Sequence, residues 1–96
     1  MNVQFEGRAE IALRSLDPPG REKVQAAIQV LEKSDLGKLR GSQKLKALKL
    51  ASREKLYSFR VDKILRLILS ASLSQWTVED IMHHDRLARL LPANGR

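Results

Sequence analysis

The chain has 96 residues, of which 18 are basic and 11 acidic, giving a net charge of +7, and it contains no cysteine. This length allows one domain with a single modest core, which we place at residues 1–91 and follow with a flexible tail, 92–96. The lack of cysteine excludes disulfides and thiolate zinc sites. The N-terminus lacks the apolar region of a signal peptide, and no apolar run approaches the roughly 20 residues of a membrane-spanning helix, so we expect a cytoplasmic protein.

The excess of positive charge lies in one central segment. Residues 1–37 contain five basic and six acidic side chains, residues 38–66 contain ten basic and two acidic ones, and residues 67–96 contain three of each. Such a block favours a polyanionic partner through direct attraction and counterion release. A solvated lysine-rich face is the plainer interpretation. Membrane binding is less favoured, because no helix pairs a basic face with large exposed apolar residues.

The first part of the chain predicts a short strand followed by two helices. Residues 2–6 alternate, with Val3 and Phe5 on one face. Apolar residues at helical spacing then lie on both sides of the sequence DPPG at 17–20; they are Ala9, Ala12, Leu13 and Leu16, then Val24, Ala27, Ile28 and Leu31. Proline cannot continue a helix but suits a first turn, so DPPG ends one helix, and Asp17 or the prolines begin the next. We expect a helical hairpin, followed by a loop at 34–42 that contains the second helix's end.

From residue 44 the apolar period changes. KLKALKL at 44–50 suits a helix or a strand, and we choose a strand because strands follow it. Three more alternating segments are separated by short turns, including a tight reversal at Asp62 and Lys63, which implies antiparallel neighbours; the segments are 55–61, 64–72 and 76–82. A final helical segment is expected at 85–91. The predicted fold class is α+β, with an N-terminal helical hairpin packed on a twisted, mostly antiparallel sheet of about four to five strands and a short C-terminal helix.

The alternation also assigns the faces of this sheet. One set of side chains should face the helices, and it consists of Tyr57, Phe59, Val61, Leu65, Leu67, Leu69 and Ala71. Arg60 and Arg66 fall on the opposite face, with Lys44 and Lys46 on the adjoining strand. The last strand leads into the chain's two histidines, which should therefore lie at the end of the sheet.

The order of these elements and several motifs resemble the RelE/ParE superfamily of toxins from type II toxin–antitoxin systems. The resemblance covers residues 3–90, and its motifs are the spacing of Phe5, Ala9 and Leu13, KLKAL at 44–48, the LYSFRV and LRLIL stretches within 56–69, and HHD at 83–85. It implies a ribosome-dependent endoribonuclease that cuts messenger RNA and so inhibits translation. The resemblance further implies no metal and no cofactor, and a separate antitoxin protein that covers the basic groove. Two alternatives stay open: a ParE-like inhibitor that binds DNA gyrase without catalysis, and an inactive nucleic-acid-binding relative.

The resemblance also implies roles for particular residues. The expected catalytic residues are His83, His84, Arg60 and Lys46, and the expected RNA- and phosphate-binding residues are Lys44, Lys49, Arg66 and Arg40. One position departs from the pattern. Related sequences often read HHDxxY, whereas this chain has Ala88 where the tyrosine would stand.

The implied chemistry explains why these residue types are needed. The ribose 2′-hydroxyl attacks the adjacent phosphate, so one group removes its proton and another protonates the leaving 5′ oxygen. Histidine suits both tasks because its usual pKa lies near neutrality. Arginine and lysine suit the third task, which is to hold the extra negative charge of the phosphorane.

Each candidate near the end of the sheet also has a plainer interpretation. Adjacent histidines at a strand end are often ordinary surface residues, and alternation sends His83 and His84 to opposite faces without showing which one meets the basic side. For the same reason no metal site is expected from these histidines and Asp85. Asp85 is favoured as a helix N-cap or ion-pair partner.

Two other residues have structural alternatives as well. Arg66 would serve the fold alone if it paired with Asp62, Glu79 or Asp80. Trp76 is expected in the core rather than stacked on an exposed base.

Overall fold

The computed structural model describes residues 1–49 and 55–91, and the predicted tail lies outside the described residues. The described part contains five strands and four helices. In chain order they are β1 Asn2–Phe5, α1 Gly7–Ser15, α2 Pro18–Glu32, α3 Leu36–Leu39, β2 Leu45–Ala47, β3 Tyr57–Arg60, β4 Leu65–Ala71, β5 Gln75–His83 and α4 His84–Leu90.

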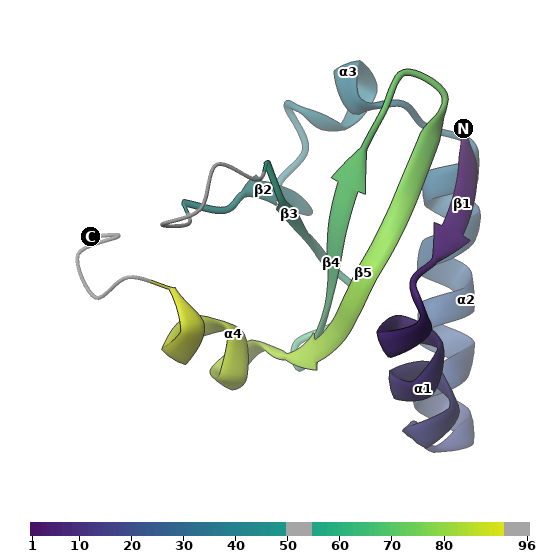
Figure 1. The fold of residues 1–96 in the computed structure, drawn as a ribbon, viewed down its shortest axis with the longest axis vertical. Helices are drawn as coiled ribbons and strands as arrows, with labels where there is room; N and C mark the ends of the chain where they lie inside the picture. Colours follow the sequence, from purple (N-terminus) through teal and green to yellow (C-terminus); the bar gives the residue numbers. More distant parts are fainter. Residues whose placement is uncertain (50–54, 92–96) are drawn as a thin grey trace.

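The strands form one sheet in the order β1-β5-β4-β3-β2. β1 runs parallel to β5, and the other neighbouring pairs are antiparallel. α1 and α2 lie along one side of this sheet, and α4 leaves the far end of β5 on the other side (Figure 1). The predicted α+β class with a mostly antiparallel sheet is confirmed.

The core lies between the helices α1 and α2 and the face of the sheet that they cover. Its buried members are Ala9, Val24, Ala27, Leu31, Leu39, Leu45, Phe59, Leu67, Leu69, Trp76, Val78 and Ile81. The stripes expected for the two helices supply this cluster, and Tyr57 packs against it as the alternation of β3 predicts. Leu73, in the β4–β5 turn, is instead fully exposed.

Trp76 ties the sheet to the end of α2. Its side chain is fully buried, and its indole Nε1 donates to the carbonyl oxygens of Leu31 at 3.1 Å and Ser34 at 3.3 Å. Both carbonyls lie at the C-terminal end of α2. That of Leu31 also accepts from the backbone N–H of Ser34 at 3.1 Å, so the indole adds a second donor there, and its own N–H is satisfied despite burial. The core assignment of Trp76 is confirmed, and a buried ring is not available to stack on a base.

The start of α2 follows the expected chemistry of DPPG. Asp17 is the N-cap, its Oδ1 accepts from the backbone N–H of Gly20 at 2.9 Å, and prolines occupy the first helical positions. The aspartate thus satisfies one of the free N–H groups at the helix start, and the prolines have no N–H to satisfy.

The prediction of a loop at 34–42 is wrong in two respects. α2 ends earlier, at Glu32, and a short helix, α3, occupies part of the segment. Asp35 begins α3 by accepting from the backbone N–H of Lys38 at 2.8 Å. An aspartate three residues before a free N–H is a capping signal that stabilises a helical turn even in a polar stretch.

The expected C-terminal helix is present as α4, but Asp85 is not its N-cap. The helix begins at His84 with His83 in the cap position, and the side chain of His83 makes no capping hydrogen bond. Asp85 lies in the first turn, where a carboxylate favours the positive end of the helix dipole. None of the described helices combines the length and apolar character needed to cross a membrane.

Candidate functional site

A β-bulge in β5 decides how its last residues face. Leu69 of β4 pairs with Val78 of β5. Ile68, the residue before Leu69 in β4, pairs with Asp80. Between these two pairs, β5 has one residue more than β4. That extra residue, Glu79, forms the bulge. Ser70 donates to Glu79 Oε2 at 2.7 Å, which holds the bulged side chain against β4.

The bulge reverses the alternation of β5 beyond this point. Ile81 is buried in the core with the helices, although an unbroken alternation from Val78 would place it on the opposite face. Met82 pairs with Arg66, and His83 pairs with Leu65. Met82 thus shares the sheet face of Arg66, which is turned away from α1 and α2 and which we call the open face.

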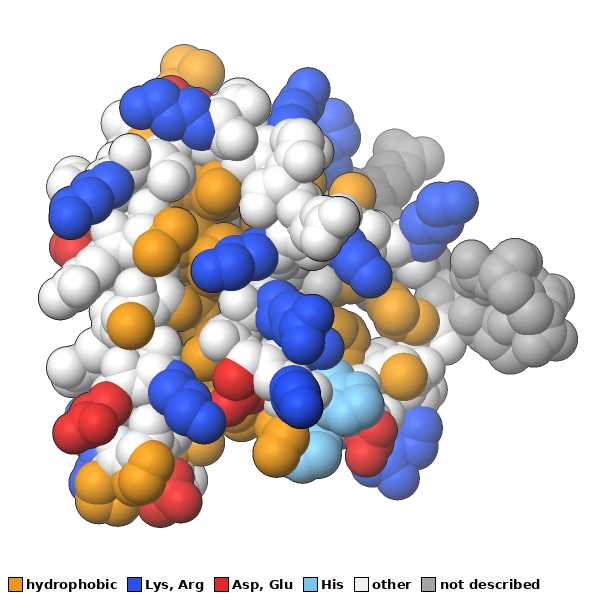
Figure 2. Space-filling model, turned by 180° about the vertical axis from the view of Figure 1, so that it is seen from behind, with side chains coloured by type: hydrophobic (Ala, Val, Ile, Leu, Met, Phe, Trp, Pro, Cys, Tyr) orange, Lys and Arg blue, Asp and Glu red, His pale blue; other side chains and the backbone are white. Residues whose placement is uncertain are grey.

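On the open face, α4 and the sheet enclose a groove of about 480 Å³. Its basic lining consists of Lys46, Lys49, Arg66 and His84, and the rest of its lining is Ala47, Leu48, Ser58, Leu87, Ala88 and Leu91. We call this the basic groove. Figure 2, which views the molecule from behind Figure 1, shows Lys and Arg side chains over the middle of the surface and the two histidines beside them. Residues from β2, β3, β4 and α4, far apart in the sequence, thus meet in one place.

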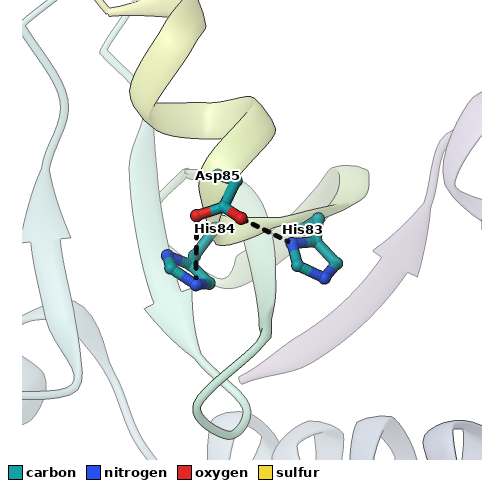
Figure 3. Close-up of side chains that lie close together, drawn as sticks. All are labelled: His83, His84 and Asp85. Carbon is teal, nitrogen blue, oxygen red and sulfur yellow. Dashed lines mark ion pairs between the residues drawn. The ribbon is translucent and has the colours of Figure 1, made fainter.

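The two histidines lie beside each other rather than apart. Their ring centroids are 5.5 Å apart with an interplanar angle of 20°, so the rings stack. Asp85 reaches both, with Oδ1 at 3.3 Å from His84 Nε2 and Oδ2 at 3.9 Å from His83 Nδ1 (Figure 3). The expectation that adjacent histidines point to opposite faces is wrong here, because β5 ends at His83 and α4 begins at His84. Strand alternation does not continue across that boundary. Asp85 as an ion-pair partner fits the structure.

The β3–β4 turn positions the two strand arginines. Arg60 and Arg66 pair across β3 and β4. Arg66 Nη1 donates to the carbonyl oxygens of Asp62 at 2.6 Å and Leu65 at 3.0 Å, and Arg60 Nε donates to the same Asp62 oxygen at 3.4 Å. Of the partners considered for Arg66, the structure shows Asp62, through its main-chain oxygen and not its carboxylate. These bonds use only part of the guanidinium, which has five N–H donors.

The carboxylate of Asp62 is held by the turn itself. Its Oδ1 accepts from the backbone N–H groups of Ile64 at 2.8 Å and Leu65 at 2.7 Å, and its Oδ2 lies 3.2 Å from Lys23 Nζ. The hydrogen bond from Leu65 is the largest cause that lowers the pKa of Asp62 from its usual 3.8. Burial, the next largest, opposes it, and the hydrogen bond from Ile64 and the ammonium of Lys23 lower the pKa further. The turn that holds both arginines is therefore fixed by a charged side chain.

The remaining predicted residues lie outside the basic groove. Lys44 and Arg60 line a smaller pocket of about 170 Å³ together with Lys23 and Val30 of α2. Arg40 is the C-cap of α3, at the opposite end of the sheet from α4 (Figure 1). The structure therefore brings together four of the eight predicted residues in the basic groove, stacks His83 on one of them, places Lys44 and Arg60 beside them along the sheet, and leaves Arg40 apart.

Sequence reasoning missed the part that Asp62 plays in this site. Asp62 was expected in a tight reversal and as a partner of Arg66, but its carboxylate was not assigned to the turn, although an aspartate in a tight reversal often accepts from N–H groups two and three residues later. Sequence reasoning also left the acidic pair Glu79 and Asp80 without a face. Both line a second groove of about 520 Å³ on the open face, beside Met82 and α4. α4 thus separates a basic groove from an acidic one.

The sequence matches no protein-family model and no curated protein. Two solved structures do match over most of their length. A chain of the archaeal RelE–RelB complex from Pyrococcus horikoshii OT3 aligns with a TM-score of 0.66 and 17% identity, covering 88% of this chain and 96% of that chain. YafQ from E. coli strain BL21(DE3) aligns with a TM-score of 0.69 and 14% identity, covering 90% and 96%. The chain has the RelE-type fold. At these identities the likeness concerns the fold, and function must be argued from the site.

Proposed function

We propose that the chain is the toxin of a type II toxin–antitoxin system and cuts messenger RNA on the ribosome. The observation that carries this proposal is the basic groove, where His84 lies with Lys46, Lys49 and Arg66 on the open face. A gyrase binder without catalysis needs no acid–base group in such a groove. The RelE-type fold supports the same interpretation.

In this proposal His84 handles protons and the cations hold the phosphate. The 2′-hydroxyl loses its proton as its oxygen bonds to phosphorus, the bond from phosphorus to the 5′ oxygen breaks, and that oxygen takes up a proton. The products are a 2′,3′-cyclic phosphate and a free 5′-hydroxyl. His84 carries one of these protons because it lines the basic groove, and His83, stacked on it, is the candidate for the other. Arg66 and Lys46 bind the phosphate oxygens as charge accumulates on them.

The surrounding residues orient these groups. Asp85 contacts both imidazoles and is proposed to fix their positions rather than to react. The Asp62 main-chain oxygen orients the guanidinium of Arg66 and leaves other N–H groups for phosphate. Lys49 lines the groove and is proposed to bind the RNA backbone.

Arg60 and Lys44 extend this cationic surface beyond the groove. We propose that they bind flanking phosphates, with Arg60 next to Arg66 across the strand pair closer to the reacting group. Arg40, at the far end of the sheet, is assigned at most a distant phosphate contact.

We also propose that a separate antitoxin protein covers the basic groove. One matching structure is a RelE–RelB complex, so a chain with this fold forms a complex with a second protein. An acidic or amphipathic segment would match the charge of the groove and the two leucines that line it, Leu87 of α4 and Leu91 at the C-cap of that helix.

One observation favours a second candidate, an inactive nucleic-acid-binding relative. Ala88 lines the basic groove at the position where related sequences often have a tyrosine. A methyl group supplies neither a ring to stack on a base nor a hydroxyl to donate. The groove would then still bind RNA through its cations.

The experiment that separates these candidates is expression of the chain in growing bacterial cells, followed by mapping of transcript 5′ ends. His84→Ala should reduce cleavage by about 10²–10⁴-fold, as expected for the loss of an acid–base group. Arg66→Ala should reduce it by about 10²–10³-fold, as for the loss of one donor to the developing charge. Arg21→Ala, an exposed arginine of α2, is the matched control and should cut like the wild type.

New 5′ ends within translated regions that disappear in His84→Ala would support the nuclease and the role of His84. Cuts that persist undiminished in His84→Ala would remove this residue from the mechanism and shift attention to the lysines and arginines. Growth arrest without cuts would overturn the nuclease proposal, and a gyrase supercoiling assay would then test the ParE-like alternative. No growth effect and no cuts, with RNA bound by the purified protein, would establish the inactive relative.

A further inference from the structure

We infer that His83, His84 and Asp85 form a binding site for a zinc ion. One ligand atom from each of the three residues can be chosen so that all lie within 4.8 Å of one another. The three side chains come from consecutive residues, yet they converge on one point at the β5–α4 boundary (Figure 3). This inference stands on the geometry of the cluster and goes beyond the proposed nuclease function, for which no metal is invoked.

The backbone explains why consecutive residues converge. His83 is extended, with φ −67° and ψ 140°, and the chain enters the helix at the next residue. Neighbours along a strand point to opposite faces, whereas neighbours in a helix diverge by only about 100°. The change from one geometry to the other brings the His83 and His84 rings to one side and places Asp85 between them.

The distances are close to those that a zinc ion requires. With metal–ligand distances of about 2.0–2.2 Å, two ligand atoms around a tetrahedral ion lie roughly 3.4 Å apart. His84 Nε2 and Asp85 Oδ1 already lie 3.3 Å apart, and His83 Nδ1 lies 3.9 Å from the other carboxylate oxygen. The full set of three ligand atoms spans up to 4.8 Å, which is wider than the tetrahedral spacing, so the side chains must rotate toward the ion, and their exposure of 44–66% leaves them room to do so.

The chemistry of the ligand set selects the ion. Two imidazole nitrogens and one carboxylate suit zinc and its borderline neighbours, whereas magnesium and calcium prefer oxygen ligands alone. Three protein ligands leave one position for water, since a fourth protein ligand is absent from the cluster found among the described residues. The basic groove contributes Arg66 and Lys46 nearby, and their charges oppose a cation, so we expect exchangeable zinc rather than a permanent structural ion.

Zinc at this site would also bear on catalysis, and this consequence rests on the proposed nuclease function. A histidine nitrogen that binds zinc cannot carry a proton at the same time, so zinc would inhibit cleavage by occupying His84. Because zinc uptake is measured without RNA, a failed binding experiment counts against the site alone. A nuclease assay without cuts counts against the proposed function alone.

The test is isothermal titration of the full chain with zinc chloride, after the protein has been dialysed against a chelating resin. We expect one zinc ion per chain, and a loss of affinity of at least about tenfold in each of His83→Ala, His84→Ala and Asp85→Ala, since even removal of a group that only supports a ligand costs 10–100-fold. Glu22→Ala, an exposed carboxylate on α2, is the matched control and should bind zinc like the wild type. Magnesium at the same concentration should give no binding heat.

NMR of the imidazole rings provides a second measurement that does not depend on heats. Zinc should shift the ring signals of both histidines together, while circular dichroism shows that each variant retains the fold. The inference is overturned if the wild type takes up no zinc. It is equally overturned if the three variants bind zinc as tightly as the wild type and Glu22→Ala do, because the zinc would then lie elsewhere.

Discussion

Replacing Asp62 should have a measurable effect on stability, because its carboxylate holds the β3–β4 turn that positions Arg60 and Arg66. Its carboxylate accepts from the backbone N–H groups of Ile64 and Leu65 and forms an ion pair with Lys23. Asp62→Ala removes these three interactions and leaves the backbone carbonyl that binds Arg66 in place. The perturbation is therefore local to the turn, and its cost can be estimated from the bonds that are lost.

Hydrogen bonds to a charged group contribute about 1.5–3 kcal/mol each, and the 22% exposed side chain places these two near or below the lower end of that range. The ion pair adds only about 0–1 kcal/mol, because the Lys23 side chain is 58% exposed. We expect Asp62→Ala to lower the free energy of unfolding by about 2–4 kcal/mol at pH 7. That is a large share of the roughly 5–15 kcal/mol by which small domains are stable.

The effect should also depend on pH with a defined sign. The pKa of Asp62 in the folded chain is below its usual 3.8, so below that value the unfolded chain binds the proton more readily than the folded chain does. The stabilisation is therefore complete above pH about 4 and is lost as pH falls through the lowered folded pKa. The difference in unfolding free energy between the wild type and Asp62→Ala should shrink below pH 4.

Urea denaturation followed by circular dichroism, at pH 7 and at steps down to pH 3, measures this difference. Asp62→Asn keeps an acceptor oxygen without the charge, so it should lose less stability than Asp62→Ala. Lys23→Ala isolates the ion pair and should cost at most about 1 kcal/mol. An Asp62→Ala protein within about 0.5 kcal/mol of the wild type at pH 7, less than even one neutral hydrogen bond, would refute this reasoning, and so would a difference that stays constant down to pH 3.

Two further substitutions test contacts that hold the helices in place. Trp76→Phe leaves the Leu31 and Ser34 carbonyls without their indole donor and removes part of a buried ring, so it should lower the unfolding free energy by about 2–4 kcal/mol in urea; a loss below about 1 kcal/mol would show that water or other donors replace the indole. Asp17→Ala removes the N-cap bond to Gly20 and should cost about 1 kcal/mol in the same assay, with Asp17→Asn close to the wild type as its control. Equal losses in both variants would contradict a capping role.

Much of the fold could be predicted because its signals are local. DPPG contains both the stop of one helix and the start of the next, and the alternation of β3 and β4 assigned their core faces correctly. The miss at α3 has a local cause too, since the Asp35 cap was outweighed by the polar composition of the segment. The pairing of β1 with β5 joins residues about 70 apart in sequence, and no local pattern predicts it.

Part of the candidate site could also be predicted from local sequence patterns, and part could not. Lys46, Lys49 and Arg66 could be named because a charge block and strand alternation are visible in the sequence, and the basic groove does contain them. The separation of Arg40 could not be predicted, because it depends on where α3 docks at the far end of the sheet (Figure 1).

By itself, the sequence determined the α+β class, the order of the main elements, the charge block and the presence of two histidines at the end of the last strand. Only the tertiary structure decided which histidine lines the basic groove. The reason is that a bulge exists only in a pair of strands: Glu79 becomes an extra residue because Val78 and Asp80 bind consecutive residues of β4. This register shift reverses the sheet face that each residue of β5 after Glu79 occupies. The helix α4, which starts at His84, then places the His84 side chain in the basic groove.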